Sequence, residues 1–326
     1  MQEIKYSVIG TSWITSSFIE GAKKIEGLKL DGVYSRSEEK GKAFAQAVGA
    51  QRVFSSIEEV ADSDTDFVYV ASPNSCHYEQ CKFLLENKKH VICEKPITTT
   101  SEEFSKLFFL AEENNVRYFE AIMYMHTSAR YDLKEAVGSI GNVSSAHFDY
   151  SQLSSKYNAL LSGDLPNIFN PEMKAGALND LGIYCVYPAI DLFGEPLQVT
   201  ALQHFLYTGA DGSGSAILKY KDKIVTITYS KTAESRAPSQ ILGDEGTVTL
   251  ASVSQLKEIK NFDKKGNVID EIASEDKITL MSNEARSMYN FITDFEHNKG
   301  LYYECAAMSQ KVLNCMEKMR TDNGAE

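Results

Sequence analysis

Three side chains in this sequence have the types and spacing needed for acid–base chemistry at an alcohol or a carbonyl carbon. Asp180 and Tyr184 are four residues apart, so on a helix they share one face. A tyrosine can protonate an alkoxide when a nearby cation lowers its pKa, and Lys95 could supply that cation or polarise a carbonyl directly. The hypothesis is Tyr184 as acid and base, Lys95 as its electrostatic partner, and Asp180 as the residue that holds Lys95 or a substrate hydroxyl.

Each of these residues also has an ordinary structural explanation. A lysine after a strand is usually a solvated loop residue, Asp180 fits a helix surface, and Tyr184 fits a packed aromatic side chain. The six histidines show no His-x-x-x-His spacing and no cluster with cysteine, so no metal site is expected. No Gly-x-Ser-x-Gly motif of a serine hydrolase occurs either.

The first predicted strand, residues 6–10, ends at a turn that resembles a dinucleotide-binding fingerprint. That fingerprint is Gly-x-Gly-x-x-Gly, but here Ser12 and Thr15 occupy the second and third glycine places. Small residues still let the backbone approach a pyrophosphate, and the helix N-terminus offers N–H groups. An ordinary tight turn is the alternative explanation. The residues expected to bind a cofactor here are Gly10, Thr11, Ser12, Trp13 and Ile14.

The second predicted strand, residues 28–34, ends in Ser35 and Arg36. An acidic residue at this place would bind the ribose 2′-hydroxyl of NAD, whereas an arginine suits the 2′-phosphate of NADP. Ser35, Arg36 and Lys40 are therefore the expected phosphate pocket, and NADP is the preferred cofactor with NAD as the alternative. A solvated arginine at a helix start would look the same, although a cation is mildly unfavourable in the first helical turn.

These residues are positioned by an alternation of strands and helices in the first 120 residues. Such alternation predicts a doubly wound parallel sheet covered on both faces, in which ligands bind at the carboxyl ends of the strands. Gly10, Ser35, Ser72 and Glu94 each follow a strand and should lie at that edge. The expected strands are 6–10, 28–34, 52–54, 66–71, 90–93 and 116–120, and the expected helices are 13–25, 38–48, 76–87 and 101–114.

The pattern changes after residue 123, where strand-like runs follow one another with short turns. Such runs predict an α+β domain with a large, mostly antiparallel open sheet. We expect residues 1–122 to bind NAD(P) and residues 123–326 to bind substrate and form the dimer. The expected strands are 142–153, 198–207, 214–220, 224–230, 240–242, 247–251 and 256–261, and the expected helices are 129–137, 177–193, 283–297 and 304–319.

Composition narrows the class of protein further. The 326 residues are 43% apolar, and the formal net charge of −12 argues against nucleic acid or a membrane surface as a partner. No basic segment followed by an apolar run begins the sequence, and no run is long enough for a membrane helix. The six cysteines contain no Cys-x-x-Cys pair, so reduced thiols and a cytoplasmic location are expected.

Three stretches together resemble the glucose–fructose oxidoreductase and inositol dehydrogenase (Gfo/Idh/MocA) family. The most specific is Glu94-Lys95-Pro96 directly after a strand. The resemblance covers nearly the whole chain. The pattern Asp-x-Gly-x-Tyr, from Asp180 to Tyr184, is similar to that of the dimeric dihydrodiol and xylose dehydrogenase branch. The stretches are Ala71-Ser72-Pro73-Asn74 with His77, residues 89–96 and residues 176–184.

This resemblance implies a nicotinamide dinucleotide cofactor and a small substrate such as a sugar, a polyol or a diol. It places Glu94 against the nicotinamide-side ribose and Lys95 beside the reacting carbon, with Asp180 and Tyr184 facing that carbon from the second domain. Tyr184 stands where many relatives have histidine, which leaves the proton donor open. The resemblance also implies a homodimer, or a dimer of dimers, formed by packing of sheet faces. The further cofactor-binding residues it implies are Ser72, Pro73, Asn74 and His77.

The predicted function is hydride transfer between a nicotinamide cofactor and a carbohydrate, polyol or diol. One alternative is a glycosidase that uses tightly bound NAD as a transient redox partner, which would retain dinucleotide and give no net redox change. The other is a non-catalytic cofactor-binding regulatory protein, which the reduced glycine motif would allow. The identity of the substrate is not predicted, although residues 154–174 and Tyr124 are expected to determine it.

Overall fold

The structure is a computed structural model and describes residues 2–321. By its internal contacts the chain divides into two compact units. Within the described residues, the first unit contains 2–126 and 276–309, and the second contains 127–275 and 310–321. The expected domain division had placed 276–309 in the second domain, whereas these residues pack in the first unit. Each unit is described by itself below.

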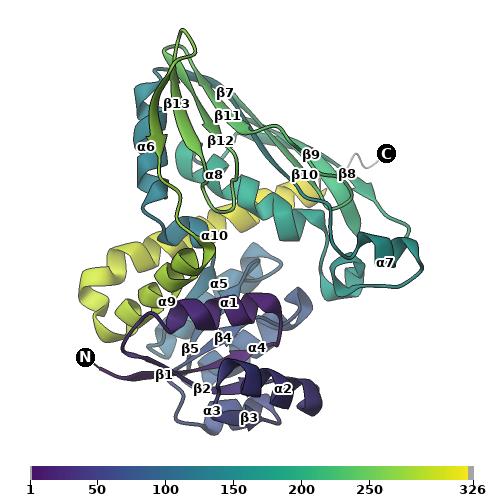
Figure 1. The fold of residues 1–326 in the computed structure, drawn as a ribbon, viewed down its shortest axis with the longest axis vertical. Helices are drawn as coiled ribbons and strands as arrows, with labels where there is room; N and C mark the ends of the chain where they lie inside the picture. Colours follow the sequence, from purple (N-terminus) through teal and green to yellow (C-terminus); the bar gives the residue numbers. More distant parts are fainter. Residues whose placement is uncertain (1, 322–326) are drawn as a thin grey trace. The chain divides into compact units, whose positions relative to one another are not determined.

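The first unit contains one sheet of six strands, which are β1 (Ile4–Ile9), β2 (Leu28–Tyr34), β3 (Arg52–Phe54), β4 (Phe67–Val70), β5 (His90–Glu94) and β6 (Tyr118–Ala121). Their order is β3-β2-β1-β4-β5-β6, and every neighbouring pair is parallel (Figure 1). The predicted doubly wound sheet is confirmed. The helices are α1 (Trp13–Ala22), α2 (Glu38–Val48), α3 (Ile57–Asp62), α4 (Asn74–Glu86), α5 (Ser101–Glu113), η1 (Met123–His126), α9 (Lys277–Thr293) and the first part of α10 (Phe295–Thr321).

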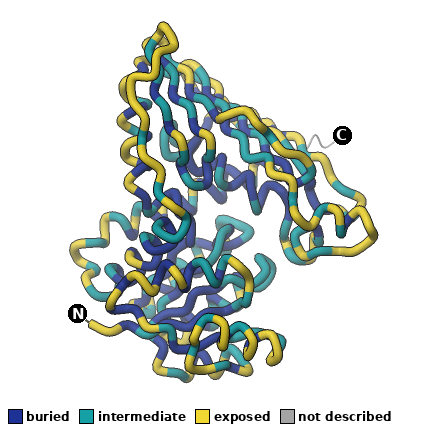
Figure 2. Tube along the Cα trace, viewed as in Figure 1, coloured by how far each residue is buried: buried dark blue, intermediate teal, exposed yellow. Residues whose placement is uncertain are grey.

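The core of the first unit joins this sheet to α1 and α9. Strand residues are buried along most of their length, as the dark blue strands in Figure 2 show. Phe18 of α1 stacks on Tyr69 of β4 with the ring centroids 3.9 Å apart. Gly21 lets α9 approach α1, because a Cβ atom there would lie 2.6 Å from the Ser282 nitrogen. Helix α9, distant in sequence, is thereby fixed beside the first strand–helix turn.

The second unit contains one sheet of eight strands, which are β7 (Val143–Ser151), β8 (Gln198–Phe205), β9 (Asp211–Lys219), β10 (Ile224–Ser230), β11 (Ser239–Gly243), β12 (Gly246–Leu250), β13 (Ile259–Asp263) and β14 (Val268–Ile272). Their order is β14-β13-β12-β11-β7-β10-β9-β8. Within this sheet, only the β10–β7 pair is parallel among the described strands, so the prediction of a mostly antiparallel sheet is confirmed. The helices are α6 (Ala129–Ser139), α7 (Tyr157–Leu161), η2 (Asn167–Phe169), η3 (Pro171–Met173), η4 (Leu178–Gly182) and α8 (Ile183–Phe193), with the end of α10.

Several elements differ from the predicted ones. Helix α3 and strand β14 were not predicted, because one is a single short helix and the other is an exposed hairpin strand. Helix α9 begins at Lys277 rather than at 283, since Asp276 caps it by accepting hydrogen bonds from the N–H groups of Ile278 and Thr279 at 2.9 and 3.0 Å. The single helix predicted for 177–193 instead begins with a π-helical turn, η4, before α8.

Two further expectations concern membranes and thiols. Among residues 2–321, no helix is long and apolar enough to cross a membrane. All six cysteines are free thiols, and five of them are buried.

Candidate active site

The β1–α1 turn has the geometry of a dinucleotide cradle. Gly10 has a φ of +107°, and a Cβ atom there would lie 2.5 Å from the carbonyl oxygen of Ala71, so only glycine fits. The Ser12 side chain makes no capping hydrogen bond to α1, and the first turn of α1 contains no acidic residue. The first N–H groups of this helix are therefore not used by the Ser12 side chain, and no first-turn carboxylate competes for them, which suits a pyrophosphate. The residues present fit the expected cofactor despite the two missing glycines.

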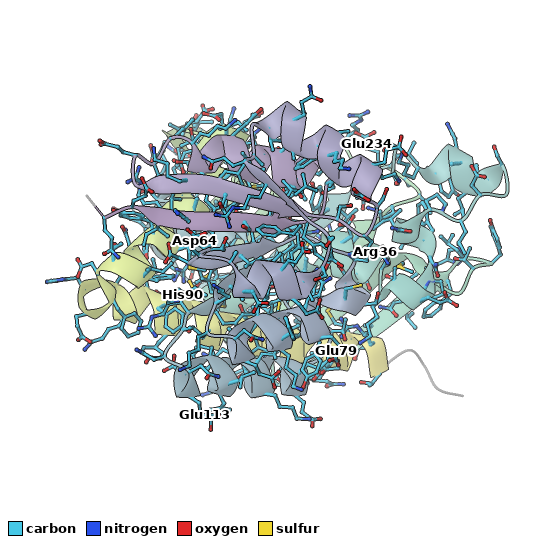
Figure 3. All side chains as sticks on the ribbon, turned by 90° about the horizontal axis from the view of Figure 1, so that it is seen from below. Arg36, Asp64, Glu79, His90, Glu113 and Glu234 are labelled. Carbon is cyan, nitrogen blue, oxygen red and sulfur yellow. The ribbon has the colours of Figure 1, made fainter. Side chains whose placement is uncertain are left out.

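The end of β2 presents an arginine at the same edge of the sheet. Arg36 is exposed, and no carboxylate of residues 2–321 forms an ion pair with it. In Figure 3 it lies at the opposite end of the sheet from Asp64 and His90, which stand where β4 and β5 begin. The Ser35 hydroxyl accepts a hydrogen bond from the N–H of Ser37 at 3.3 Å, which orders the turn. Arg36 is thus available to an anion at the carboxyl edge, and Lys40 is exposed nearby on α2.

The loops after β4 and β5 are joined by His77. Its Nδ1 lies 2.9 Å from the Pro96 carbonyl oxygen, and its Nε2 lies 2.9 Å from the Ser72 carbonyl oxygen. The side chain is buried, and that burial lowers its pKa, although the two carbonyl contacts oppose the shift. Because both ring nitrogens are engaged within the protein, His77 fixes the two loops rather than offering a nitrogen to a ligand. Pro73 and Asn74 lie where α4 begins.

Glu94 is held rigidly at the end of β5. The Tyr69 hydroxyl donates to its Oε1 at 2.5 Å, and the N–H of Lys95 donates to its Oε2 at 3.2 Å. Burial raises the pKa of Glu94, while Lys95, Tyr69 and Lys277 act in the opposite direction. A carboxylate with fixed orientation can accept a hydrogen bond from a ribose or substrate hydroxyl without losing side-chain entropy on binding.

The structure adds a second acid beside Glu94 that the sequence analysis missed. Glu284 on α9 is only 1% exposed, and its Oε2 atom is buried without a hydrogen-bond partner among residues 2–321. Burial, followed by the charge of Glu94, raises the pKa of Glu284 well above the ordinary value. The predicted helix began at residue 283, which made Glu284 an unremarkable first-turn acid. Its real position is further into α9, on the face that packs on the sheet.

Glu284→Gln is expected to stabilise the protein at neutral and alkaline pH. The unfolded chain releases the Glu284 proton near pH 4.5, whereas the folded chain retains it, so wild-type stability falls as pH rises above that value. Glutamine has no proton to release. The unfolding midpoint of the variant should match that of wild type in acid and exceed it increasingly as pH rises, in thermal unfolding followed by circular dichroism. A difference between the two unfolding midpoints that does not change with pH would contradict a protonated Glu284.

In the second unit, a glycine and a buried aspartate shape the turn that carries Asp180. A Cβ atom on Gly176 would lie 1.8 Å from Asp211 Oδ1, and Gly176 has a φ of +124°. Asp211 Oδ2 accepts the N–H of Leu178 at 2.7 Å, while burial raises the pKa of Asp211. This contact begins the π-helical turn η4, a rare element that occurs mostly at functional sites.

Asp180 is paired with a lysine that was not predicted. Lys231, at the end of β10, donates to Asp180 Oδ2, and the Lys231 side chain is only 8% exposed. Tyr184 lies edge-on to Tyr150 of β7, with the ring centroids 5.5 Å apart. A π-turn is wider than an α-turn, so the four-residue spacing of Asp180 and Tyr184 does not by itself place them on one face. In the sequence, Lys231 is recognisable only as a lysine directly after a predicted strand. Lys95 has the same kind of position, but it also lies in the Glu94-Lys95-Pro96 motif.

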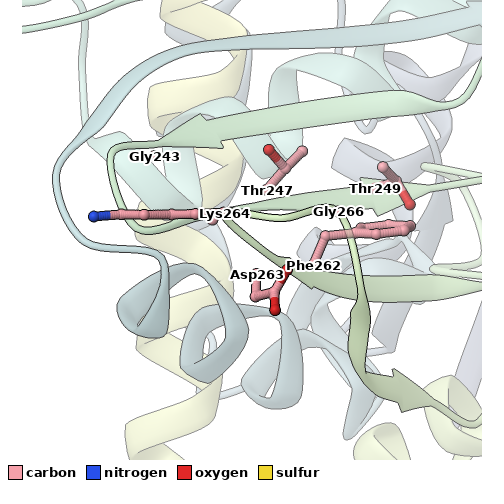
Figure 4. A pocket seen from close by; sticks show the side chains of 8 residues that line it. Gly243, Thr247, Thr249, Phe262, Asp263, Lys264 and Gly266 are labelled. Carbon is pink, nitrogen blue, oxygen red and sulfur yellow. The ribbon is translucent and has the colours of Figure 1, made fainter.

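A shallow groove on the second sheet is not a candidate for the chemistry. Its charged side chains are already engaged in turns: Asp263 Oδ1 accepts the N–H groups of Lys265 and Asn267 at 2.8 and 2.9 Å, and Lys264 pairs with Glu245 at 2.8 Å. The residues that line it are Gly243, Gly246, Thr247, Thr249, Phe262, Asp263, Lys264 and Gly266 (Figure 4).

Comparison with known proteins identifies the family of this chain. Residues 4–122 match an oxidoreductase family with an NAD-binding Rossmann fold, and residues 133–249 match the GFO/IDH/MocA C-terminal domain. The chain belongs to the GFO/IDH/MocA oxidoreductase family. The resemblance inferred from Glu94-Lys95-Pro96 is therefore confirmed, as are the NAD-binding Rossmann domain and the oxidoreductase class.

Two bacterial GFO/IDH/MocA members and one amphibian relative illustrate the similarity. The scyllo-inositol 2-dehydrogenase (NADP(+)) IolU of Bacillus subtilis is 37% identical over 91% of this chain and 89% of its own length. The uncharacterized oxidoreductase YgjR of Escherichia coli is 37% identical over 86% of each chain. The trans-1,2-dihydrobenzene-1,2-diol dehydrogenase of Xenopus laevis is 28% identical over 76% of this chain and 75% of its own.

Among solved structures, a 3-ketoreductase from Actinomadura kijaniata shares the GFO/IDH/MocA fold. Its complex with NADP and TDP-benzene superposes with a TM-score of 0.86 at 19% identity, covering 98% of each chain. At that identity the match concerns the fold alone.

Proposed function

We propose that this protein is an NADP-preferring dehydrogenase or reductase that acts on a polyol, a diol or a related carbohydrate. The observation that carries the proposal is the fixed Glu94 with Lys95 beside it, at the sheet edge that also presents the Gly10 turn and the exposed Arg36. The arginine favours a 2′-phosphate. The relative that is 37% identical bears a name that specifies scyllo-inositol and NADP(+), which supports the substrate class and the cofactor.

The proposed chemistry assigns one task to each residue. A bound nicotinamide supplies or accepts the hydride. Lys95 carries the positive charge that stabilises a developing alkoxide, and Glu94 accepts a hydrogen bond from a hydroxyl of the bound ligand. Tyr184 donates or removes the proton at the hydroxyl oxygen. Asp180, with its charge balanced by Lys231, orients a substrate hydroxyl.

Tyr184→Phe is expected to lower kcat by about 100-fold or more, because a general acid–base contributes roughly 10²–10⁴-fold. Its ring contact with Tyr150 survives the change, so the packing of the ring should be kept. The pH profile of kcat should lose the limb that the Tyr184 phenol produces in wild type. Tyr150→Phe is the matched control and should keep that limb. A Tyr184→Phe enzyme with a wild-type pH profile would exclude Tyr184 as the proton donor.

The substrate class is tested with a panel of inositols, inososes, aldoses and diols. Each compound is assayed for oxidation with NADP⁺ and for reduction with NADPH, and every positive reaction is repeated with NAD⁺ or NADH. We expect turnover with at least one cyclic polyol or its ketone, and a higher kcat/KM with the phosphorylated cofactor. Tight binding of NADPH without turnover of any compound would favour a regulatory role instead.

We also propose that the protein is a cytoplasmic homodimer formed through the second sheet. Leu202, Ile217 and Ile224 are exposed on one face of β8, β9 and β10, and their strand register places them on the same side. Exposed apolar side chains that gather on one face are typical of an interface. Light scattering should give a mass of two chains for wild type and a mass of one chain for Ile217→Asp. The free thiols support a reducing compartment.

A further inference from the structure

Helix α9 brings a lysine to the cofactor turn of the first unit. The Nζ atom of Lys277 lies 3.6 Å from the centroid of the Trp13 ring. Trp13 is the first residue of α1 and directly follows Ser12 of the glycine turn. The backbone at Lys277 is fixed within the unit, because Asp276 caps α9 at this end and Gly21 packs α1 against α9. A residue remote in sequence therefore holds a cation above the N-terminus of α1.

Lys277 supplies a charge that the turn itself does not contain. The residues from Gly10 to Ser16 include no basic side chain, and two glycines of the usual fingerprint are absent. The Trp13 ring is 67% exposed, so the ammonium group rests on an aromatic face at the surface rather than inside the core. An ammonium group at that place adds its field to that of the helix N-terminus.

The positive charge of Lys277 also acts on two carboxyl groups, one of which lies at the end of β5. Lys277 acts to lower the pKa of both Glu94 and Glu284, although burial dominates in each case and raises the pKa. The groups that Lys277 acts on include Glu94 from β5, Glu284 from α9 itself and the Trp13 ring from α1. Lys277 therefore contacts the first residue of α1 and also acts on Glu94, the residue expected to contact the nicotinamide-side ribose. A dinucleotide bound to this fold has its pyrophosphate between the β1–α1 turn and the end of β5.

We propose that Lys277 binds the pyrophosphate of the cofactor and replaces part of the phosphate contact that the missing glycines would have allowed. This inference rests on the proposed NADP-dependent function. The Trp13 ring lies against the ammonium group, and the Asp276 cap fixes the start of the helix that carries Lys277. The lysine contributes affinity for any ligand that carries the diphosphate, whatever nicotinamide redox state or substrate accompanies it.

The test compares the binding of three ligands to wild type and to Lys277→Met. NADPH and 2′-phospho-ADP-ribose both contain the diphosphate, whereas 2′-AMP contains only the adenylate part with its 2′-phosphate. Trp13 is the single tryptophan of the chain, so quenching of its emission reports binding at this turn, and calorimetry provides an independent value. We expect Lys277→Met to weaken NADPH and 2′-phospho-ADP-ribose by a similar factor of about tenfold, with 2′-AMP nearly unchanged.

Two further variants separate charge from folding. Lys277→Arg keeps the cation and should bind within a few-fold of wild type. Lys24→Met removes another lysine that contacts α9, through Thr279 at 3.3 Å, but at the far end of α1, and should have no effect. Weaker binding of NADPH alone would mean that Lys277 acts through the nicotinamide side and would overturn the proposal, as would unchanged binding of all three ligands. Wild type that binds none of them would instead refute the proposed cofactor use itself.

Discussion

Lys95→Ala is expected to lower kcat by about 10³-fold while the affinity for NADPH stays within a few-fold of wild type. The variant removes the cation proposed to stabilise the alkoxide, and electrostatic stabilisation of this kind commonly contributes a factor of about 10²–10³ or more. The backbone N–H of residue 95 still donates to Glu94 Oε2, so the carboxylate keeps its orientation. The residue is only partly buried, and its removal leaves no large cavity.

The matched control is Lys89→Ala. Lys89 lies just before the opposite end of β5, where its Nζ donates to the carbonyl oxygens of Ser63 and Thr65 at 2.7 and 2.9 Å. We expect that variant to lose stability and to keep its kcat. Steady-state rates, NADPH titration and thermal unfolding on both variants separate the two effects. A Lys95→Ala enzyme that keeps more than about a tenth of the wild-type kcat would exclude Lys95 from the chemical step.

Arg36→Ala is expected to weaken NADPH by about 10- to 100-fold, since hydrogen bonds to charged groups contribute about 1.5–3 kcal/mol. NADH lacks the 2′-phosphate, so its affinity should change less than about threefold on the same physical argument. The exposed guanidinium has no carboxylate partner among residues 2–321, so its loss should leave unfolding unchanged.

A control for Arg36 comes from the neighbouring helix. Lys42 is also exposed, but its Nζ pairs with Glu38 at 2.5 Å, so Lys42→Ala should leave the ratio of NADPH to NADH affinity unchanged. Dissociation constants are measured for both cofactors at two ionic strengths. The dissociation constant for NADPH should rise more steeply with salt than that for NADH in wild type and in Lys42→Ala, because a charge–phosphate contact is screened. Equal losses for NADPH and NADH in Arg36→Ala would refute the 2′-phosphate assignment.

The first sheet could be predicted from the sequence because its signals are local. Each of the first five strands is a short run with buried residues followed by a turn and a helix, and a side chain caps α2, α3 and α5. Helix α5 begins at Ser101 as predicted, although the capping oxygen belongs to Thr100, whose Oγ1 lies 3.1 Å from the Glu103 nitrogen. The parallel sheet then places Gly10, Ser72 and Glu94 at one edge without any further information.

Residues brought together by tertiary packing could not be predicted in this way. Glu284 and Lys277 act at the first-unit site only because Gly21 allows α9 to pack on α1, and because Asp276 starts that helix earlier than the apolar pattern indicated. Lys231 reaches Asp180 across the second sheet, from a residue 51 positions away in the chain. The π-turn η4 depends on a contact between Leu178 and Asp211, which no local periodicity records.

The most direct test of the central claim is the transfer of deuterium from NADPH labelled at the nicotinamide C4 position. The protein is incubated with the labelled cofactor and a ketone from the substrate panel, and the product is analysed by mass spectrometry. We predict one deuterium on the new carbinol carbon with wild type, an equal amount of NADP⁺, and almost none of either with Lys95→Ala. Product that forms without deuterium, or without net oxidation of NADPH, would contradict a hydride-transferring dehydrogenase and favour a transient redox role for the cofactor.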